Sequence, residues 1–192
     1  MATQQTDEKI IKAFSKLVLK LGYQGTTTKR IASEAGVNES TIFRHFKDKH
    51  SILEQLVNTY SRDIEQIGQS FEFTGDIVQD LMRVATIYHD FVANHQVVFL
   101  LGLRESYRFP EIGQALRQLP KRFKNLVVTN FNEMVEAGEI RATANVTEEA
   151  TNFILLNFGN AVFTYAYPTA RLQVPMKAFL AENIRTFAEH LQ

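Results

Sequence analysis

The 192-residue chain contains no cysteine. It can therefore form neither a disulfide framework nor a zinc site built from thiolates. Its five histidines do not have the H-E-x-x-H spacing that places two zinc ligands on one face of a helix. These absences predict an intracellular protein that holds no metal and no other cofactor.

The chain also lacks a long hydrophobic run. No segment approaches the roughly 18 uninterrupted apolar residues of a transmembrane helix, and the densest one, NFILLNFGNAVFTYAY, is broken by Asn152, Asn157 and Asn160. The N-terminal residues MATQQTDEK contain no apolar core of the kind found in signal peptides. We therefore expect a soluble, cytoplasmic protein that does not enter a membrane.

Patterns that would indicate catalysis are missing as well. The sequence has no visible nucleophile–base pair, no paired carboxylates and no phosphate-binding loop. It does have 45% hydrophobic residues, including 15 Phe, which is enough to build a large core. The sequence thus predicts a folded protein that is not an enzyme.

Charge is unevenly distributed although the net charge is zero. Residues 1–50 contain nine Lys and Arg against five Asp and Glu, whereas the remainder contains 12 against 16. A basic N-terminal segment joined to an acidic remainder suggests that the first part contacts a polyanion.

Apolar residues recur at helical spacing almost throughout, which predicts an all-α fold. One helix should end at Gly22, a second should run from Thr27 or Thr28 to Gly36, and a third and a fourth should begin after Asn38 and Asp48. Only QVVFLL could form a strand on local propensity. Further helices are expected at about 76–94, 96–107, 110–137, 147–166 and 175–191.

A three-residue turn, Gly-Val-Asn, separates the second and third expected helices, as in a helix-turn-helix. With Ile42 and Phe46 facing inward, Ser40 and Arg44 point outward, and Thr41 and Phe43 flank them. Arginine and hydroxyl side chains on such an edge can bind base edges in DNA. Lys49 lies at a helix start, where the helix dipole disfavours a cation unless a phosphate is bound beside it.

The segment TTTKRIASEAGVNESTIFRHFKDKHSIL resembles the DNA-binding domain of the TetR/AcrR family of bacterial transcriptional regulators. The resemblance covers about residues 8–55. It implies about nine helices, with a helix-turn-helix DNA-binding domain in residues 1–50 and a ligand-binding and dimerisation domain in residues 51–192. It also implies phosphate contacts at the starts of the second and fourth helices and a recognition helix between them. The implied DNA-binding residues are Thr28, Lys29, Glu39, Ser40, Thr41, Phe43, Arg44, His45 and Lys49.

Two of these positions depart from the pattern of the family. Phe43 stands where tyrosine is usual, so this side chain can make only an apolar contact. Glu39 stands where many members have Lys or Arg. It can either stabilise its helix through the dipole or accept a hydrogen bond from the N4 amine of cytosine.

For the larger part of the chain, the resemblance implies an apolar cavity for a hydrophobic or amphipathic small molecule. Candidate lining residues are Tyr60, Tyr88, His95, Arg104, Tyr107, Phe131 and Asn157. Apolar stripes on the last two helices predict a homodimer interface. Its candidate residues are Phe153, Leu156, Gly159, Phe163, Phe179, Ile184, Phe187 and Leu191.

The expected function is that of a repressor which binds a palindromic operator in double-stranded DNA as a homodimer and is released by an effector. Two alternatives use the same fold. The regulator could be controlled by a protein partner instead of a small molecule, or it could activate transcription.

Overall fold

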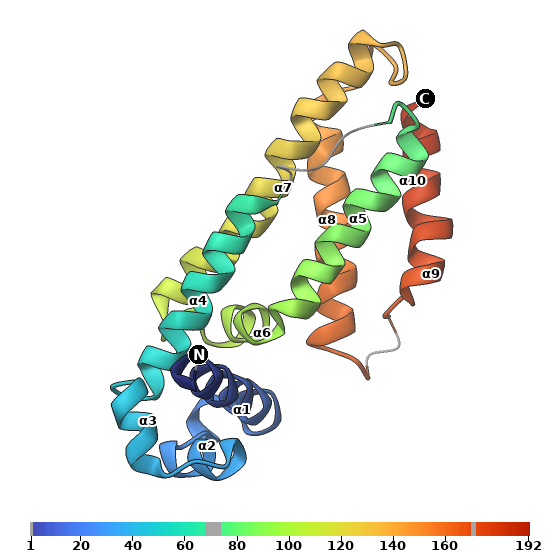
Figure 1. Ribbon diagram of the computed structural model, residues 1–192. Coiled ribbons are helices and arrows are strands. Elements are labelled where there is room, and N and C mark those ends of the chain that lie inside the picture. Colours follow the sequence, from blue (N-terminus) through green and yellow to red (C-terminus); the bar gives the residue numbers. More distant parts are fainter. Residues whose placement is uncertain (1, 68–73, 170–171) are drawn as a thin grey trace. The chain divides into compact units, whose positions relative to one another are not determined.

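The computed structural model describes residues 2–67, 74–169 and 172–192, and these residues form helices and their connections without a strand (Figure 1). The all-α prediction is confirmed. QVVFLL, the one segment with strand propensity, begins helix α6 (Gln96–Glu105). In this part of the chain, every helix is too short or too polar to cross a bilayer.

The first three helices are α1 (Ala2–Gly25), α2 (Thr28–Ala35) and α3 (Glu39–His45). Gly22 interrupts α1 with a left-handed φ of 71°, which confirms that regular helix stops there. Thr27 caps α2 by accepting a hydrogen bond from the Arg30 amide, and Gly36 ends it with a φ of 68°. Asn38 precedes α3 but makes no capping hydrogen bond with its side chain.

Helix α4 (Lys49–Gln66) starts after Asp48, as expected. The Asp48 carboxylate accepts hydrogen bonds from the Ser51 amide at 2.8 Å and from its hydroxyl at 3.1 Å. These bonds lower the pKa of Asp48. A carboxylate at a helix N-terminus satisfies free amides and complements the helix dipole, so this cap fixes where α4 begins.

Contacts divide the chain into two compact units. One contains residues 1–62 and 97–115, and the other contains residues 63–96 and 116–192. The N-terminal helices therefore share a unit with α6 and with the first residues of α7 (Pro110–Glu136). The proposed functional division at residue 50 remains a prediction.

The second unit is a helical bundle. It contains α5 (Ile77–Asn94), most of α7, α8 (Val146–Tyr165), and a continuous last helix made of α9 (Met176–Ala178), the π-helical η1 (Phe179–Ile184) and α10 (Arg185–Leu191). With these last three counted as one, the described residues form nine helices. Helix α5 packs against α8, η1 and α10, which lie beside it in Figure 1. Large side chains from three helices fill the core, among them Tyr88, Phe123, Phe131 and Phe153.

Asp80 fixes the start of α5 from inside the fold. Its carboxylate is fully buried and accepts hydrogen bonds from the Thr74 amide at 2.8 Å, the Thr74 hydroxyl at 3.0 Å and the Gly75 amide at 3.2 Å. Hydrogen bonds to a buried ionised group contribute more to stability than neutral ones do.

We expect Asp80→Ala to lower the free energy of unfolding by about 2–4 kcal/mol, because two backbone amides lose their acceptor inside the protein. Urea unfolding at a fixed protein concentration measures the change. The control is Gln79→Ala, at the neighbouring exposed position of the same helix, which should change stability by less than about 0.5 kcal/mol. Equal effects of the two substitutions would contradict the role given to Asp80.

Candidate nucleic-acid interface

The two faces of α3 divide as the sequence predicts. Ile42 is fully buried and Phe46 is 5% exposed, so these two side chains anchor the helix in its unit. Glu39, Ser40, Phe43 and Arg44 are exposed, and the Phe43 ring is 54% exposed. A short helix anchored by so few residues and carrying polar side chains on its open edge can enter the major groove of DNA.

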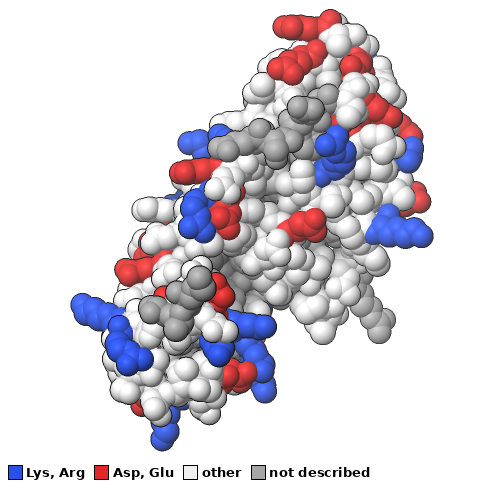
Figure 2. All heavy atoms as spheres, viewed as in Figure 1, with Lys and Arg blue, Asp and Glu red and all other residues white. Residues whose placement is uncertain are grey.

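Arg44 and Lys29 are available for DNA. Both are exposed, and within the described residues no hydrogen bond or ion pair engages either side chain. Figure 2 shows Lys and Arg side chains around the part of the surface formed by the N-terminal helices, at the lower left. This surface has the charge that attracts a phosphate backbone.

His45 lies elsewhere than on the open edge. Its side chain is only 8% exposed, and Nδ1 lies 2.6 Å from the Asp7 Oδ1 atom on α1. Position 45 comes three residues after Ile42, so its side chain turns toward the buried side of α3. His45 therefore ties α3 to α1 instead of lying on the exposed edge, and its implied role in DNA binding remains a prediction.

Glu39 has a partner that neither of its predicted roles includes. Its Oε1 atom accepts a hydrogen bond of 2.6 Å from the Thr28 hydroxyl. Thr28 is the first residue of α2 and Glu39 is the first residue of α3. The bond therefore joins the starts of two helices. A hydroxyl has a single proton, so Thr28 cannot donate to Glu39 and to a DNA phosphate at the same time.

Lys49 is engaged by the protein itself. Its ammonium group donates to the carbonyl oxygens of Tyr23 at 2.8 Å and Thr26 at 3.0 Å, and it lies 4.1 Å from the centre of the Tyr23 ring. Partial burial and the Arg108 guanidinium lower the pKa of Lys49. An ammonium group has three donors, so only one remains for the phosphate that the sequence predicts here.

Phe109, which lies outside the first 50 residues, belongs to the same unit and packs against the N-terminal helices. The Phe109 ring contacts the edge of the Tyr23 ring, with 4.7 Å between centres, and stacks on the His50 ring at 6.0 Å. Phe109 thus touches the end of α1 and the start of α4. No local pattern in the sequence indicates this contact.

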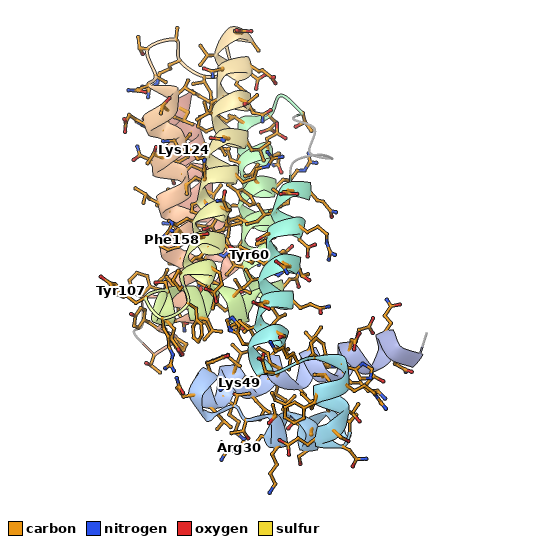
Figure 3. All side chains as sticks on the ribbon, turned by 90° about the vertical axis from the view of Figure 1, so that its left-hand side faces the viewer. Arg30, Lys49, Tyr60, Tyr107, Lys124 and Phe158 are labelled. Atoms are coloured by element: carbon orange, nitrogen blue, oxygen red, sulfur yellow. The ribbon has the colours of Figure 1, made fainter. Side chains whose placement is uncertain are left out.

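The predicted ligand-binding residues are divided between the two units. Tyr60, Arg104 and Tyr107 belong to the first unit and the other four belong to the second. Tyr107 is fully exposed and points away from the helices in Figure 3, and Arg104 is exposed.

The remaining candidates lie inside their units. His95 pairs with Asp63, with 3.3 Å between Nε2 and Oδ2, and Tyr60 and Phe131 are fully buried. Tyr88 and Asn157 are fully buried too, and in the described part of the chain the Tyr88 hydroxyl and the Asn157 Oδ1 atom have no hydrogen-bond partner. Burial raises the pKa of Tyr88, so its hydroxyl stays protonated and can donate.

The predicted dimer residues fall into two groups. Phe153, Phe179, Ile184 and Leu191 are at most 2% exposed, so the chain's own helices already cover them and no surface remains for a partner. Leu156, Gly159, Phe163 and Phe187 keep part of their surface. Leu155, which is not among the predicted dimer residues, is 61% exposed on α8.

The open edge of α3, the short turn before it and the exposed cations around it define a DNA-binding protein of the helix-turn-helix class. Residues 10–56 match the family described as bacterial regulatory proteins of the tetR family. Residues 10–56 therefore form the DNA-binding domain of a TetR-family transcriptional regulator.

Similar proteins agree with this assignment. The chain is 29% identical over 184 residues to YvkB, an uncharacterized HTH-type transcriptional regulator of Bacillus subtilis (strain 168). The matched residues cover 96% of each chain. It is 27% identical over 141 residues to the fatty acid metabolism regulator protein of the same organism, which covers 71% of this chain and 72% of that relative.

Solved structures share the fold. A TetR-family transcriptional regulator from Agrobacterium tumefaciens has a TM-score of 0.68 at 17% identity and covers 99% of both chains. The transcriptional regulator FadR from Bacillus subtilis, solved in complex with stearoyl-CoA, has a TM-score of 0.68 at 18% identity and covers 96% of this chain and 99% of that one.

The Thr28–Glu39 hydrogen bond leads to a prediction for Glu39→Gln. We expect this variant to bind every DNA duplex about fivefold more tightly, because a carboxylate near the phosphates costs on the order of 1 kcal/mol in water. Fluorescence anisotropy with an operator and an unrelated duplex measures both affinities.

Glu8→Gln is the matched control, since it removes the same charge from an exposed position of α1. Two results would contradict this electrostatic role of Glu39. A changed preference at one base pair alone would make Glu39 a base reader, and a change in stability alone would leave it a helix-dipole residue.

Proposed function

We propose that the protein is a repressor that binds a palindromic operator as a homodimer and releases it when a small hydrophobic or amphipathic molecule binds. Membership of the TetR family gives the coarser function, DNA-binding regulation of transcription. The exposed edge of α3 supports the finer proposal that the protein recognises a specific DNA sequence. Ser40 and Arg44 supply hydrogen bonds there, and Phe43 supplies an apolar contact.

Dimerisation through α8 and the last helix is supported by apolar surface that these helices leave uncovered. Leu155 on α8 is 61% exposed, and Leu156, Gly159 and Phe187 are partly exposed. Two copies related by a twofold axis would bury this surface against itself. Such a dimer would place its two recognition helices about one DNA turn, ~34–36 Å, apart or slightly more, so the operator should be palindromic.

A buried effector site is supported by two buried polar groups of the second unit that have no hydrogen-bond partner among the described residues. The Tyr88 hydroxyl and the Asn157 carbonyl oxygen lie on α5 and α8, which pack together. A buried polar group without a hydrogen bond costs about 1–3 kcal/mol, and a ligand that bonds to it recovers this cost. The apolar side chains around both groups favour a ligand with a long hydrophobic part.

The crystallised FadR holds stearoyl-CoA, an amphipathic molecule with a long acyl chain. This makes acyl thioesters and fatty acids the first effectors to test. Release requires only that the effector bind the non-DNA-binding conformation better than the DNA-binding one, by a few kcal/mol.

The recognition assignment predicts different consequences for Arg44→Ala and Lys29→Ala. After an operator is selected from a random DNA pool, Arg44→Ala should lose preference at one base position per half-site, at a cost of about 1–3 kcal/mol there. Lys29→Ala should weaken all sequences alike and reduce the slope of log K against log salt by about one unit. Anisotropy titrations with single-base operator variants at several salt concentrations measure both.

Each variant serves as the control for the other, because both remove one exposed cation from the same unit. Unchanged base preference in Arg44→Ala would exclude α3 as the reading element. A non-palindromic selected site would count against the symmetric dimer.

The effector assignment predicts that Tyr88→Phe leaves the free energy of unfolding within about 1 kcal/mol of the parent, because the hydroxyl has no hydrogen-bond partner to lose among the described residues. The same change should raise the concentration of acyl-CoA or fatty acid needed to release the operator by about tenfold, equivalent to about 1.4 kcal/mol.

Thermal unfolding and operator release by a chain-length series of acyl-CoA thioesters provide the two measurements. Tyr107→Phe, which alters a fully exposed tyrosine, is the matched control and should change neither. If no compound in the series released the operator, control by a protein partner would replace the small-molecule assignment.

A further inference from the structure

A pocket separate from all seven predicted ligand residues opens in the second unit. It has a volume of about 360 Å³, large enough for a small organic molecule. One wall comes from α5, one from the end of α8, and the third from the residues that lead into α9. The lining residues are His89, Asp90, Ala93, Asn160, Thr164, Tyr165, Gln173, Val174, Pro175 and Met176.

His89 is the most unusual of these residues. It is 7% exposed, and no group in the described part of the chain forms a hydrogen bond with its Nε2 atom. The Phe179 and Tyr88 rings lie against the imidazole, with 5.3 Å and 5.9 Å between ring centres. Their packing holds the ring in place in the wall of the pocket.

The imidazole is neutral under physiological conditions. Burial lowers the pKa of His89 to about 4, although the nearby Asp90 carboxylate opposes this effect. A neutral ring with its proton on Nδ1 presents Nε2 as a hydrogen-bond acceptor. His89 therefore contributes an acceptor to the pocket and no positive charge.

Asp90 gives the pocket its charge. Its carboxylate is exposed at the rim, and no described lining residue is a Lys or Arg that could neutralise it. Burial and the Asp90 carboxylate both raise the pKa of Tyr165, so the phenol stays protonated beside the carboxylate. The charge of the described lining attracts cations and repels anions.

One polar contact shapes the opposite wall. The Asn160 Oδ1 atom accepts a hydrogen bond from the Val174 amide at 3.2 Å, which holds the segment before α9 against α8. Val174, Pro175 and Met176 thereby present an apolar surface to the pocket. The pocket thus combines an apolar wall with a carboxylate and a neutral acceptor.

We propose that this pocket is a second small-molecule site, selective for organic amines that carry an ammonium group on a compact apolar body. The ammonium group donates to the Asp90 carboxylate and to His89 Nε2, and the apolar body packs on Val174, Pro175 and Met176. This preference is opposite in charge to that of a fatty acid or an acyl-CoA. The pocket is lined by other residues than the proposed effector site, although the Tyr88 ring lies against His89, and the proposal does not depend on the proposed effector.

Three probes of nearly equal size and different charge test the proposal on the full-length protein: 2-phenylethylamine, 2-phenylethanol and phenylacetate. Calorimetric titration, with NMR transfer experiments for weak binding, measures each affinity. We expect the amine to bind at least tenfold more tightly than the carboxylate, with the alcohol between them.

Two substitutions separate the contributions of the pocket. Asp90→Asn should bring the amine and the alcohol to within about threefold of each other, because the charge preference is lost. His89→Phe should weaken the amine and the alcohol alike, because it removes the shared acceptor and places a larger ring in the pocket. Glu133→Gln removes a charge from an exposed position of α7, outside the pocket, and should leave all three affinities unchanged.

Equal affinities for the three probes, no saturable binding of any of them, or amine binding that is unaffected by both pocket variants would each overturn the proposal. Operator binding measured in the same samples keeps the two assignments apart. Loss of operator binding bears on the proposed regulatory function alone, and loss of charge-selective amine binding bears on the second site alone.

Discussion

The ammonium group of Lys49 fixes the geometry on which the DNA-binding helices depend. It joins the carbonyl oxygens of Tyr23 and Thr26 to the first residue of α4, while the Tyr23 ring covers it. These carbonyls belong to the end of α1 and to the connection that leads into α2. The ends of three helices thus meet at one cation, and the position of α3 between α2 and α4 follows from that junction.

Local periodicity was sufficient to predict the fold and the division of α3 into two faces. The spacing of Ile42 and Phe46 identified the buried side, and the caps at Thr27 and Asp48 marked two helix starts. The engagement of His45 and Lys49 was not predictable in this way. Their partners, Asp7 and Tyr23, are 38 and 26 residues away in the sequence, and helical spacing carries no information about such distant contacts.

The larger part of the chain shows a different limit of sequence-based prediction. Phe153 and Leu155 are both apolar residues of α8, yet Phe153 is fully buried and Leu155 is 61% exposed. An apolar stripe in the sequence does not indicate whether it is covered by the same chain or by a partner. His89 and Asp90 were not predicted either, because their pocket is completed by residues 173–176, which follow α8 in the chain and have no signature of their own.

Phe109 connects parts of the first unit that are far apart in the sequence. Its ring contacts Tyr23 at the end of α1 and His50 at the start of α4. These two residues precede Phe109 by 86 and 59 positions in the sequence. Local opening of the segment around Phe109 would expose both contacts together. We therefore expect the DNA-binding helices and the α6–α7 junction to open together, although they are far apart in the sequence.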